Sequence, residues 1–339
     1  VAVSDEYVWF GNDNSEFFCY DKKGTKIWEF NINEQFQDQT GDVEGCPSLM
    51  YINDDEYYDV VFTVEETGLL ALDGKTGELL WSFISNSYSG YLNSQAVYDL
   101  NDDGIKDVIF GAENHPSSFY GDRAVALDGR TGQLLWQYST DSGIHASPLV
   151  LETKNGVKIL ITECYSTISF LNIDGTAEHY LEKNMNTGGI SGLFSSPVVT
   201  DKNKLIIGTS WWGTEDGIWF MDIDDQYIIE GPYGTKYEEN VLKFIQTGRV
   251  SASAFVADIL KTSKGFEVGI CTEDGELVIF SEKGKLLERV FLPAGAEASP
   301  TVADIDGDGK LELLIACLDG NLYCYDTDSK GKVFWGQFR

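Results

Sequence analysis

The chain contains the sequence Ala71-Leu72-Asp73-Gly74-Lys75-Thr76-Gly77-Glu78-Leu79-Leu80-Trp81 and repeats it as Ala126-Leu127-Asp128-Gly129-Arg130-Thr131-Gly132-Gln133-Leu134-Leu135-Trp136. Weaker copies run from Cys19-Tyr20-Asp21 to Trp28 and from Cys324-Tyr325-Asp326 to Trp335. In each copy an apolar run ends at Asp, a glycine-bearing turn follows, and a second apolar run contains the Trp. This order predicts a β-hairpin that recurs along the chain.

A second marker recurs upstream of these hairpins. It is a small residue followed by a run rich in β-branched residues, which suits the crowded innermost strand of a repeat unit. The copies begin at Cys46, Ser94, Ser147, Ser196, Ser253 and Ser299, at intervals of 46 to 57 residues. With a first unit starting at Val1, the sequence predicts seven units of about 48 residues.

Each unit is expected to contain four antiparallel strands, because no helical period of 3.6 residues persists along the chain. Repeated four-stranded units without helices predict an all-β fold, a single closed β-propeller of seven four-stranded blades. Eight blades remain the alternative, since residues 201–246 are irregular. Residues 1–339 are expected to form one domain, with Val1 beside the last unit. The expected blades are 1–32, 46–84, 94–139, 145–182, 195–247, 251–292 and 298–339.

Two acidic loops have the spacing of a calcium site. Residues 99–107 and 304–312 place oxygen side chains at loop positions 1, 3, 5 and 9, with Gly at position 6. Such spacing wraps the chain around a hard cation, and position 7 contributes its backbone carbonyl. The predicted Ca²⁺ ligands are Asp99, Asn101, Asp103, Ile105 and Asp107 in one loop, and Asp304, Asp306, Asp308, Lys310 and Glu312 in the other.

The second unit carries an eroded copy of this loop, with Asn53, Asp55 and Asp59. Tyr51 replaces its first ligand and Glu56 replaces the glycine. A third metal site there is left open.

The two loops resemble the calcium loops of FG-GAP repeats in integrin α-subunits, and the Asp-Gly-x-Thr-Gly phrases resemble the tryptophan-docking repeats of pyrroloquinoline-quinone (PQQ) propellers. The resemblance implies that Trp28, Trp81, Trp136 and Trp335 pack between neighbouring blades. Quinoproteins of this kind are usually larger, often eight-bladed, and many hold the cofactor beside a disulfide of adjacent cysteines. The chain has no adjacent cysteines, so no PQQ is expected.

Charge and cysteine usage bound the partners. The chain carries 55 Asp and Glu against 24 Lys and Arg, a net charge of −31, which disfavours nucleic acid and anionic membranes. No apolar run approaches the roughly 18 residues of a membrane span. The six cysteines form no metal or redox motif and are expected to be free. We expect a monomer in an extracellular, periplasmic or cell-surface location.

The loops that join strands two to three, and four to one, collect aromatic and polar residues on one face. The ligand candidates there are Tyr88, Tyr91, His115, Phe119, Tyr120, Trp211 and Trp212. Such residues suit a glycan or protein ligand. The sequence therefore favours a non-enzymatic, calcium-stabilised binding or scaffold propeller. Alternatives are a calcium-dependent carbohydrate-active enzyme, such as a polysaccharide lyase, and a structural domain of a larger surface protein.

Overall fold

The protein is all-β in its computed structural model. The model describes residues 1–36, 41–43, 45–53, 55–65, 67–84, 88–90, 93–114, 122–153, 156–164, 167–182, 195–202, 204–210, 216–222 and 242–336. Within these ranges the single helix is the four-residue α1 (Ile32–Gln35). By its internal contacts the chain packs as two compact units.

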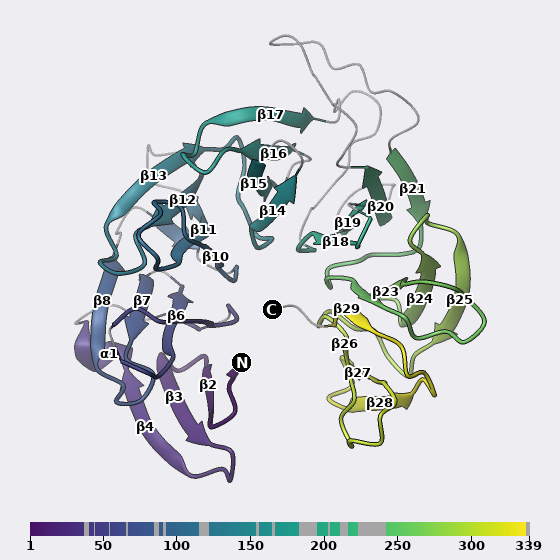
Figure 1. The fold of residues 1–339 in the computed structure, drawn as a ribbon, viewed down its shortest axis with the longest axis horizontal. Helices are drawn as coiled ribbons and strands as arrows, with labels where there is room; N and C mark the ends of the chain where they lie inside the picture. Colours follow the sequence, from purple (N-terminus) through teal and green to yellow (C-terminus); the bar gives the residue numbers. More distant parts are fainter. Residues whose placement is uncertain are drawn as a thin grey trace. The chain divides into compact units, whose positions relative to one another are not determined.

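The first unit comprises Val1–Glu152, Val157–Glu163 and Ser169–Glu178. It holds the first three blades and most of the fourth, each an antiparallel sheet in chain order (Figure 1). The strands are β1 (Ala2–Val3), β2 (Tyr7–Gly11), β3 (Glu16–Asp21) and β4 (Lys26–Asn31); β5 (Ser48–Met50), β6 (Asp59–Val64), β7 (Gly68–Leu72) and β8 (Leu79–Ile84); β10 (Ala96–Tyr98), β11 (Asp107–Asn114), β12 (Arg123–Leu127) and β13 (Leu134–Ser139), with β9 (Tyr88–Gly90) paired to β11; and β14 (Leu149–Thr153), β15 (Gly156–Thr162), β16 (Thr167–Leu171) and β17 (Ala177–Glu182).

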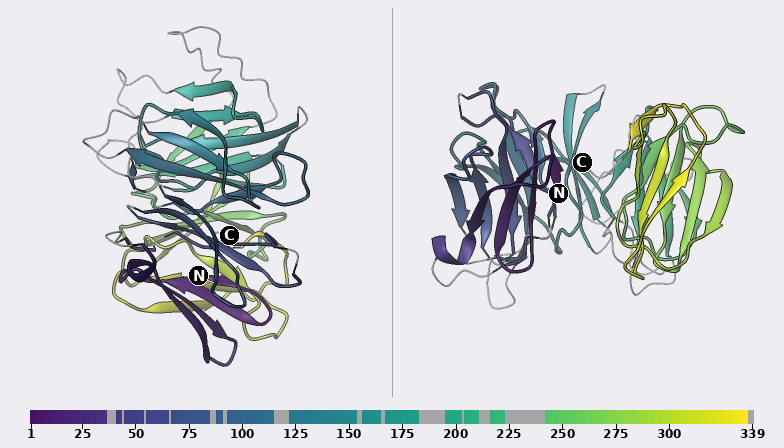
Figure 2. Two further views of the ribbon diagram at one scale, coloured as in Figure 1. Left: turned by 90° about the vertical axis from the view of Figure 1, so that its left-hand side faces the viewer. Right: turned by 90° about the horizontal axis from the view of Figure 1, so that it is seen from below.

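The second unit comprises Thr153–Gly156, Cys164–Ile168 and His179–Arg339. It holds the last three blades, whose twisted sheets are seen edge-on in Figure 2. The strands are β18 (Val198–Val199), β19 (Lys204–Thr209), β20 (Gly217–Asp222) and β21 (Leu242–Gln246); β22 (Phe255–Ala257), β23 (Glu267–Cys271), β24 (Glu276–Ser281) and β25 (Leu286–Phe291); β26 (Thr301–Ala303), β27 (Glu312–Ala316) and β28 (Leu322–Asp326); and the last strand, β29 (Val333–Trp335).

The seven sheets confirm the prediction of a seven-bladed β-propeller. In the second and third blades the middle strands are the most buried, and every residue of β6, β7 and β12 is buried. Their near-continuous Val, Leu, Phe and Ala content follows from this position between neighbouring sheets. The third strand of the seventh blade, β28, has no buried residue. Closure of the ring at Val1, and the single-domain organisation, stay predictions.

The seventh blade departs from the expected pattern in its last strand. The sequence predicts β29 as the outer strand beside β28, but β29 pairs with the free edge of β22, with Trp335 opposite Val256. The indole Nε1 of Trp335 is buried without a hydrogen-bond partner in the described part of the chain. Trp335 therefore does not bind a hairpin turn as the other three tryptophans do; it packs against an apolar cluster formed by residues of the fifth and sixth blades. A local hairpin phrase cannot show that a distant strand edge competes for the same residues.

The other three tryptophans dock as the repeat implies. Nε1 of Trp28 donates to Gly74 O at 3.1 Å, and Nε1 of Trp81 donates to Gly129 O at 2.9 Å. Each indole of a blade thus binds the hairpin turn of the next. Trp136 continues the series, with Nε1 donating to Ile173 O at 2.9 Å.

The last glycine of the Asp-Gly-x-Thr-Gly phrase is required by its backbone conformation and by the indole that packs against it. Gly77 and Gly132 have positive φ angles of 78° and 68°. A Cβ there would lie 2.8 Å from the ring of Trp28 and 2.7 Å from the ring of Trp81. Both the backbone conformation and the close approach of the indole therefore require glycine.

The small residues that precede the first strand of a blade link neighbouring blades. The amide of Cys46 donates to Ser94 Oγ at 2.7 Å, and the amide of Ser94 donates to Ser147 Oγ at 3.0 Å. In the second unit the amide of Ser253 donates to Ser299 Oγ at 2.9 Å. A hydroxyl at this position satisfies a backbone amide of the preceding blade, which the marker alone does not reveal.

The connections from the fourth strand to the next blade are hydrogen-bonded to both blades that they join. In the second unit the amide of Val250 donates to Thr209 O at 3.0 Å, and the amide of Glu273 donates to Arg249 O at 3.0 Å. The segment around Arg249 is thereby fixed between the second-strand ends of two blades. This arrangement positions one of the two clusters described below.

All six cysteines are free, as predicted. Burial raises the pKa of the Cys19 and Cys271 thiols to about 12, so these side chains serve as inert apolar groups. Across the described ranges, no helix has the length and apolar character needed to cross a bilayer.

Candidate functional site

In four loops between first and second strands, a buried carboxylate holds the loop backbone. It stands at the ninth loop position in three of them and one residue later, as Glu267, in the sixth blade. This carboxylate accepts the amide hydrogen of the second loop residue. It is present even in the loops of the second and sixth blades, which lack part of the calcium-type pattern. The pairs are Asp59 with Ile52 (2.8 Å), Asp107 with Leu100 (2.8 Å), Glu267 with Ile259 (2.9 Å) and Glu312 with Ile305 (2.7 Å). The sequence could not separate this structural role from metal ligation, since both use a carboxylate.

In the third-blade loop the acidic groups are engaged by the protein itself. Asp107 Oδ2 accepts the Leu100 amide, and its Oδ1 accepts the amide of Gly129 at 2.9 Å. Asp99 accepts the amides of Asp103 and Gly104 at 3.2 and 3.0 Å. Burial is the main cause that raises the pKa of Asp107.

The other predicted ligands of this loop are also engaged. Asn101 Oδ1 accepts the amide of Asp103, and its amide nitrogen donates to Asp128 Oδ2 at 3.1 Å. Asp103 Oδ1 accepts the amide of Ile105 at 2.8 Å. The predicted ligand residues lie together in one turn, and hydrogen bonds within the protein account for its shape.

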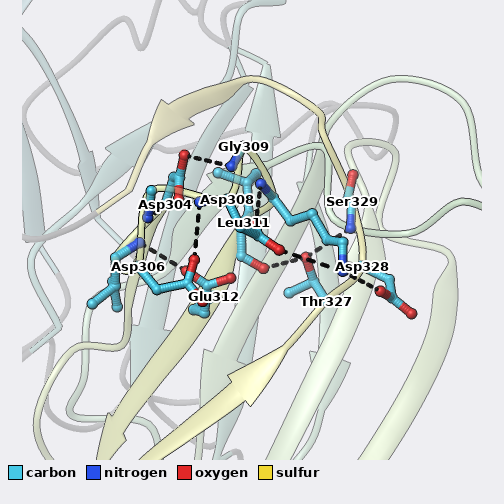
Figure 3. Close-up of polar contacts among 12 residues, drawn as sticks. Asp304, Asp306, Asp308, Gly309, Leu311, Glu312, Thr327, Asp328 and Ser329 are labelled. Carbon is cyan, nitrogen blue, oxygen red and sulfur yellow. Dashed lines mark hydrogen bonds and ion pairs between the residues drawn. The ribbon is translucent and has the colours of Figure 1, made fainter.

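The seventh-blade loop gathers three carboxylates, and the two at its start accept loop amides as in the third blade. Asp304 accepts the amides of Gly307 and Gly309, and Asp306 accepts that of Asp308. Asp304, Asp306 and Glu312 each place a carboxylate oxygen within 4.8 Å of the others. Figure 3 shows these side chains at the loop between β26 and β27. Glu312 is 5% exposed, and its Oε1 has no hydrogen-bond partner in the described part of the chain.

Lys310 pairs with Asp308, which is not among the three clustered carboxylates. Its Nζ lies 3.5 Å from Asp308 Oδ2 and 3.1 Å from Asp328 Oδ1. The neighbouring carboxylates raise the pKa of Lys310. Asp308, predicted as a ligand, therefore faces a cation of the protein.

In the eroded second-blade loop, the side-chain amide of Asn53 hydrogen-bonds to the neighbouring carboxylates. The side-chain nitrogen of Asn53 donates to Asp59 Oδ1 and to Asp73 Oδ2, each at 3.2 Å. Asp55 Oδ1 accepts the amide of Tyr57 at 2.8 Å. In the described residues, three-carboxylate clusters of metal-binding size occur only in the seventh blade.

Most of the predicted ligand face lies outside the described residues. Tyr91, His115, Phe119, Tyr120, Trp211 and Trp212 fall there, and Tyr88 is described only as part of β9. Their roles stay predictions.

A polar cluster that the sequence did not single out lies in the second compact unit, where second strands end. Glu273 Oε1 accepts hydrogen bonds from Ser210 Oγ at 2.7 Å and from Ser251 Oγ at 2.5 Å. Its Oε2 lies 3.3 Å from Nε of Arg249. These residues come from the ends of β19 and β23 and from the connection between β21 and β22.

Asp216, just before β20, completes this cluster. Its Oδ1 is buried without a hydrogen-bond partner in the described part of the chain. Burial is the largest cause that raises the pKa of Asp216, while Arg249 lowers it and Asp274 and Glu273 raise it. A carboxyl group with these neighbours can accept a proton from a bound ligand.

One sequence signal could have pointed to the cluster. Thr272-Glu273 follows β23, and Thr162-Glu163 stands at the equivalent end of β15, where Thr162 is the last strand residue. Glu163 is buried and accepts the Asp141 amide at 2.9 Å. The repeat thus places a glutamate against the four-to-one connection in two blades, and Arg249 is the feature particular to the second of them.

The chain is similar to known proteins in sequence and in structure. A family model described as outer membrane protein assembly factor BamB, a PQQ-type repeat model, matches residues 1–155. A polyvinylalcohol dehydrogenase from a Pseudomonas species is 22% identical over 297 residues, covering 82% of this chain; the chain spans 43% of that relative.

Two crystal structures extend the likeness. The quinohemoprotein alcohol dehydrogenase of Comamonas testosteroni superposes with a TM-score of 0.66 and 13% identity, over 100% of this chain and 67% of that one. BamB from Moraxella catarrhalis superposes with a TM-score of 0.53 and 14% identity, over 96% and 95% of the two chains.

The fold is that of a PQQ-like β-propeller. The resemblance stated for the tryptophan-docking repeats is thus supported, while the FG-GAP resemblance of the acidic loops stays a prediction.

Two expectations drawn from the sequence are corrected by these relatives. The non-enzymatic, calcium-stabilised binding or scaffold propeller is wrong, because the relatives of this PQQ-like propeller include dehydrogenases, and neither a lyase activity nor a glycan ligand is supported. The expected absence of PQQ is also wrong, because it conflicts with relatives that are quinoproteins. A disulfide of adjacent cysteines only provides a surface against which the quinone packs, so its absence does not exclude the cofactor. A smaller number of blades does not exclude it either, because it removes no group that would bind the quinone.

Proposed function

We propose that this chain is the propeller of a quinone-dependent dehydrogenase that oxidises a hydroxyl group. The observation that carries the proposal is the alignment with a polyvinylalcohol dehydrogenase over 82% of the chain. The cluster of Arg249, Glu273 and Asp216 supplies the groups that such a reaction asks of a protein.

Arg249 fits a quinone that bears carboxylates, as PQQ does. Its side chain is 47% exposed, and Glu273 engages only Nε. The two terminal amino groups have no partner among the described residues and can bind a carboxylate in bidentate fashion. Glu273 fixes the guanidinium, and the hydroxyls of Ser210 and Ser251 fix Glu273.

Asp216 is the candidate base. When bound, the quinone would supply the two-electron acceptor for the carbon that carries the hydroxyl. Asp216 would accept the hydroxyl proton, because its buried Oδ1 has no other donor in the described part of the chain. Its raised pKa strengthens it as a base and predicts that kcat/KM falls as the pH drops through that pKa.

We place the protein outside the cytoplasm. The support is the family description, which names an outer membrane assembly factor.

The test is titration of the purified chain with PQQ and Ca²⁺, followed by dye-linked oxidation of small alcohols and of polyvinyl alcohol. Tryptophan quenching reports quinone binding independently of activity. Asp216→Asn should keep quinone binding and lose turnover, whereas Arg249→Gln should lose quinone binding. The matched control is Arg289→Gln, which breaks the Arg289–Glu276 pair of 2.9 Å on β25 and β24 and should change neither.

Failure of the folded parent to bind quinone or to reduce the dye would overturn this function. A second candidate would then stand, the docking of a protein partner within an assembly. The observation favouring it is the near-equal length of this chain and BamB, which cover each other over 96% and 95%. Cross-linking in the native cell tests it, and crosslinks spread over many proteins with no shared site on the propeller would argue against it.

A further inference from the structure

We propose that the seventh-blade loop binds one hard cation of the Ca²⁺ type through Asp304, Asp306 and Glu312, and that the third-blade loop, despite its matching sequence, binds none. The proposal is independent of any quinone. It rests on a difference between two loops that the sequence makes equivalent.

The difference lies in the ninth-position carboxylate. Both oxygens of Asp107 are occupied by backbone amides, those of Leu100 and Gly129, at 2.8 and 2.9 Å. Glu312 gives only one oxygen to its loop, through the Ile305 amide, and its Oε1 has no partner among the described residues. A buried carboxylate oxygen without a donor is costly, and a cation would satisfy it.

The turn that follows the third strand differs between these blades. In the second and third blades, the turn glycine between the third and fourth strands donates its amide to the ninth-position carboxylate, Gly74 to Asp59 and Gly129 to Asp107. In the seventh blade the chain leaves β28 and pairs with β22. Thr327, which follows Asp326 as Gly74 follows Asp73, donates its amide to Leu311 O at 3.1 Å and not to Glu312.

The third loop position adds a second difference, because Asn101 is neutral and Asp306 is charged. The amide of Asn101 also donates to Asp128 at 3.1 Å, which fixes the side chain toward the neighbouring turn. Asp304 and Asp306 are exposed, and their oxygens lie within 4.8 Å of each other and of Glu312.

This separation suits one shared ion. Ligand oxygens lie about 2.3–2.6 Å from Ca²⁺, so two of them on opposite sides are roughly 5 Å apart. Because Asp304 and Asp306 are exposed, water can complete the six or more ligands that Ca²⁺ takes.

Calorimetric titration of the whole metal-free chain with CaCl₂ tests the proposal. Two variants at the first loop position are matched, because each aspartate accepts two loop amides: Asp304→Asn in the seventh blade and Asp99→Asn in the third. Glu312→Gln removes the charge of the buried ligand. We expect one site per parent chain, at least about tenfold weaker binding in Asp304→Asn and Glu312→Gln, and unchanged binding in Asp99→Asn.

Circular dichroism and melting curves establish that each variant is folded before titration. Two equivalent sites in the parent, or loss of binding in Asp99→Asn, would overturn the proposal. So would a folded parent that takes up no Ca²⁺ at millimolar concentration. None of these results bears on quinone binding, so this proposal and the proposed function fail separately.

Discussion

At the scale of single residues, the chain repeatedly uses a side-chain acceptor to satisfy a backbone amide that a propeller would otherwise bury. The ninth-position carboxylates do this in the loops, and serine hydroxyls do it between blades. The sequence reveals such positions as repeats but not their partners, since a carboxylate that binds an amide and one that binds a metal leave the same spacing.

The serine link predicts a measurable loss of stability. Ser94 is buried, and Ser94→Ala would leave the Cys46 amide without its acceptor. We expect the free energy of unfolding to fall by about 1–3 kcal/mol. Urea denaturation measures it, with Ser82→Ala on the exposed side of β8 as the control. Equal effects of the two variants would show that the link contributes nothing specific.

At the scale of elements, the hairpin phrase correctly predicted the docking of three of its four tryptophans, because each of the three contacts the turn of the next blade. An indole at a fixed place in the fourth strand meets the turn of the next blade, as Trp81 meets Gly129. Trp335 has the same phrase, but its strand pairs with β22. The choice between two strand edges depends on residues far away in sequence, so the phrase could not decide it.

Docking of the indole makes one turn glycine more sensitive than another. Gly132 and Gly24 both lie in turns between third and fourth strands and have positive φ, but only Gly132 lies against an indole; a Cβ at Gly24 meets nothing within 4 Å. Gly24→Ala therefore measures backbone strain alone, about 1 kcal/mol or somewhat more. Gly132→Ala should cost at least about 1 kcal/mol beyond that, by the displacement of Trp81. Comparison of their denaturation midpoints tests this, and equal losses would contradict it.

The indole of Trp335 in β29 has no hydrogen-bond partner among the described residues, so its replacement should cost less stability than that of a docked tryptophan. Trp81→Phe removes a hydrogen bond of 2.9 Å to Gly129 O, whereas Trp335→Phe removes none that the described residues provide. We expect Trp81→Phe to destabilise the protein by about 1 kcal/mol more than Trp335→Phe. Thermal unfolding of both variants measures the difference. A larger loss for Trp335→Phe would mean that β29 makes contacts beyond its pairing with β22.

At the scale of the whole molecule, the sequence predicted the seven blades, because the small-residue marker that opens a blade recurs at intervals of 46 to 57 residues. It could not predict the Arg249 cluster, which is assembled from Ser210, Ser251 and Glu273 at separate points of the chain. Only folding brings these residues together.

The charge of the whole molecule predicts that moderate acidity stabilises it. The buried carboxyls of Asp59, Asp107, Glu163 and Glu267 have pKa values raised chiefly by burial. A group whose pKa is raised in the folded state binds more protons there than in the unfolded state. Its contribution to stability is complete below the ordinary carboxyl pKa and is lost as the pH rises through the raised value. The exposed carboxyls whose pKa is lowered, such as Asp319 and Asp328, act only below the ordinary pKa, so they do not oppose this effect near neutrality.

The melting temperature should therefore rise as the pH falls from about 7.5 toward about 5.5, where partial protonation also relieves the repulsion of a chain at −31. Added NaCl should raise it at pH 7.5 by screening that repulsion. Two matched variants separate the contributions. Glu163→Gln removes a buried carboxyl, whereas Glu78→Gln removes the same charge at an exposed turn. If burial is the cause, the pH dependence weakens in Glu163→Gln and persists in Glu78→Gln. A melting temperature that falls steadily from pH 7.5 to 5.5 in the parent would show that the buried carboxyls are stabilised as anions by their amide donors, and the sign argued here would be reversed.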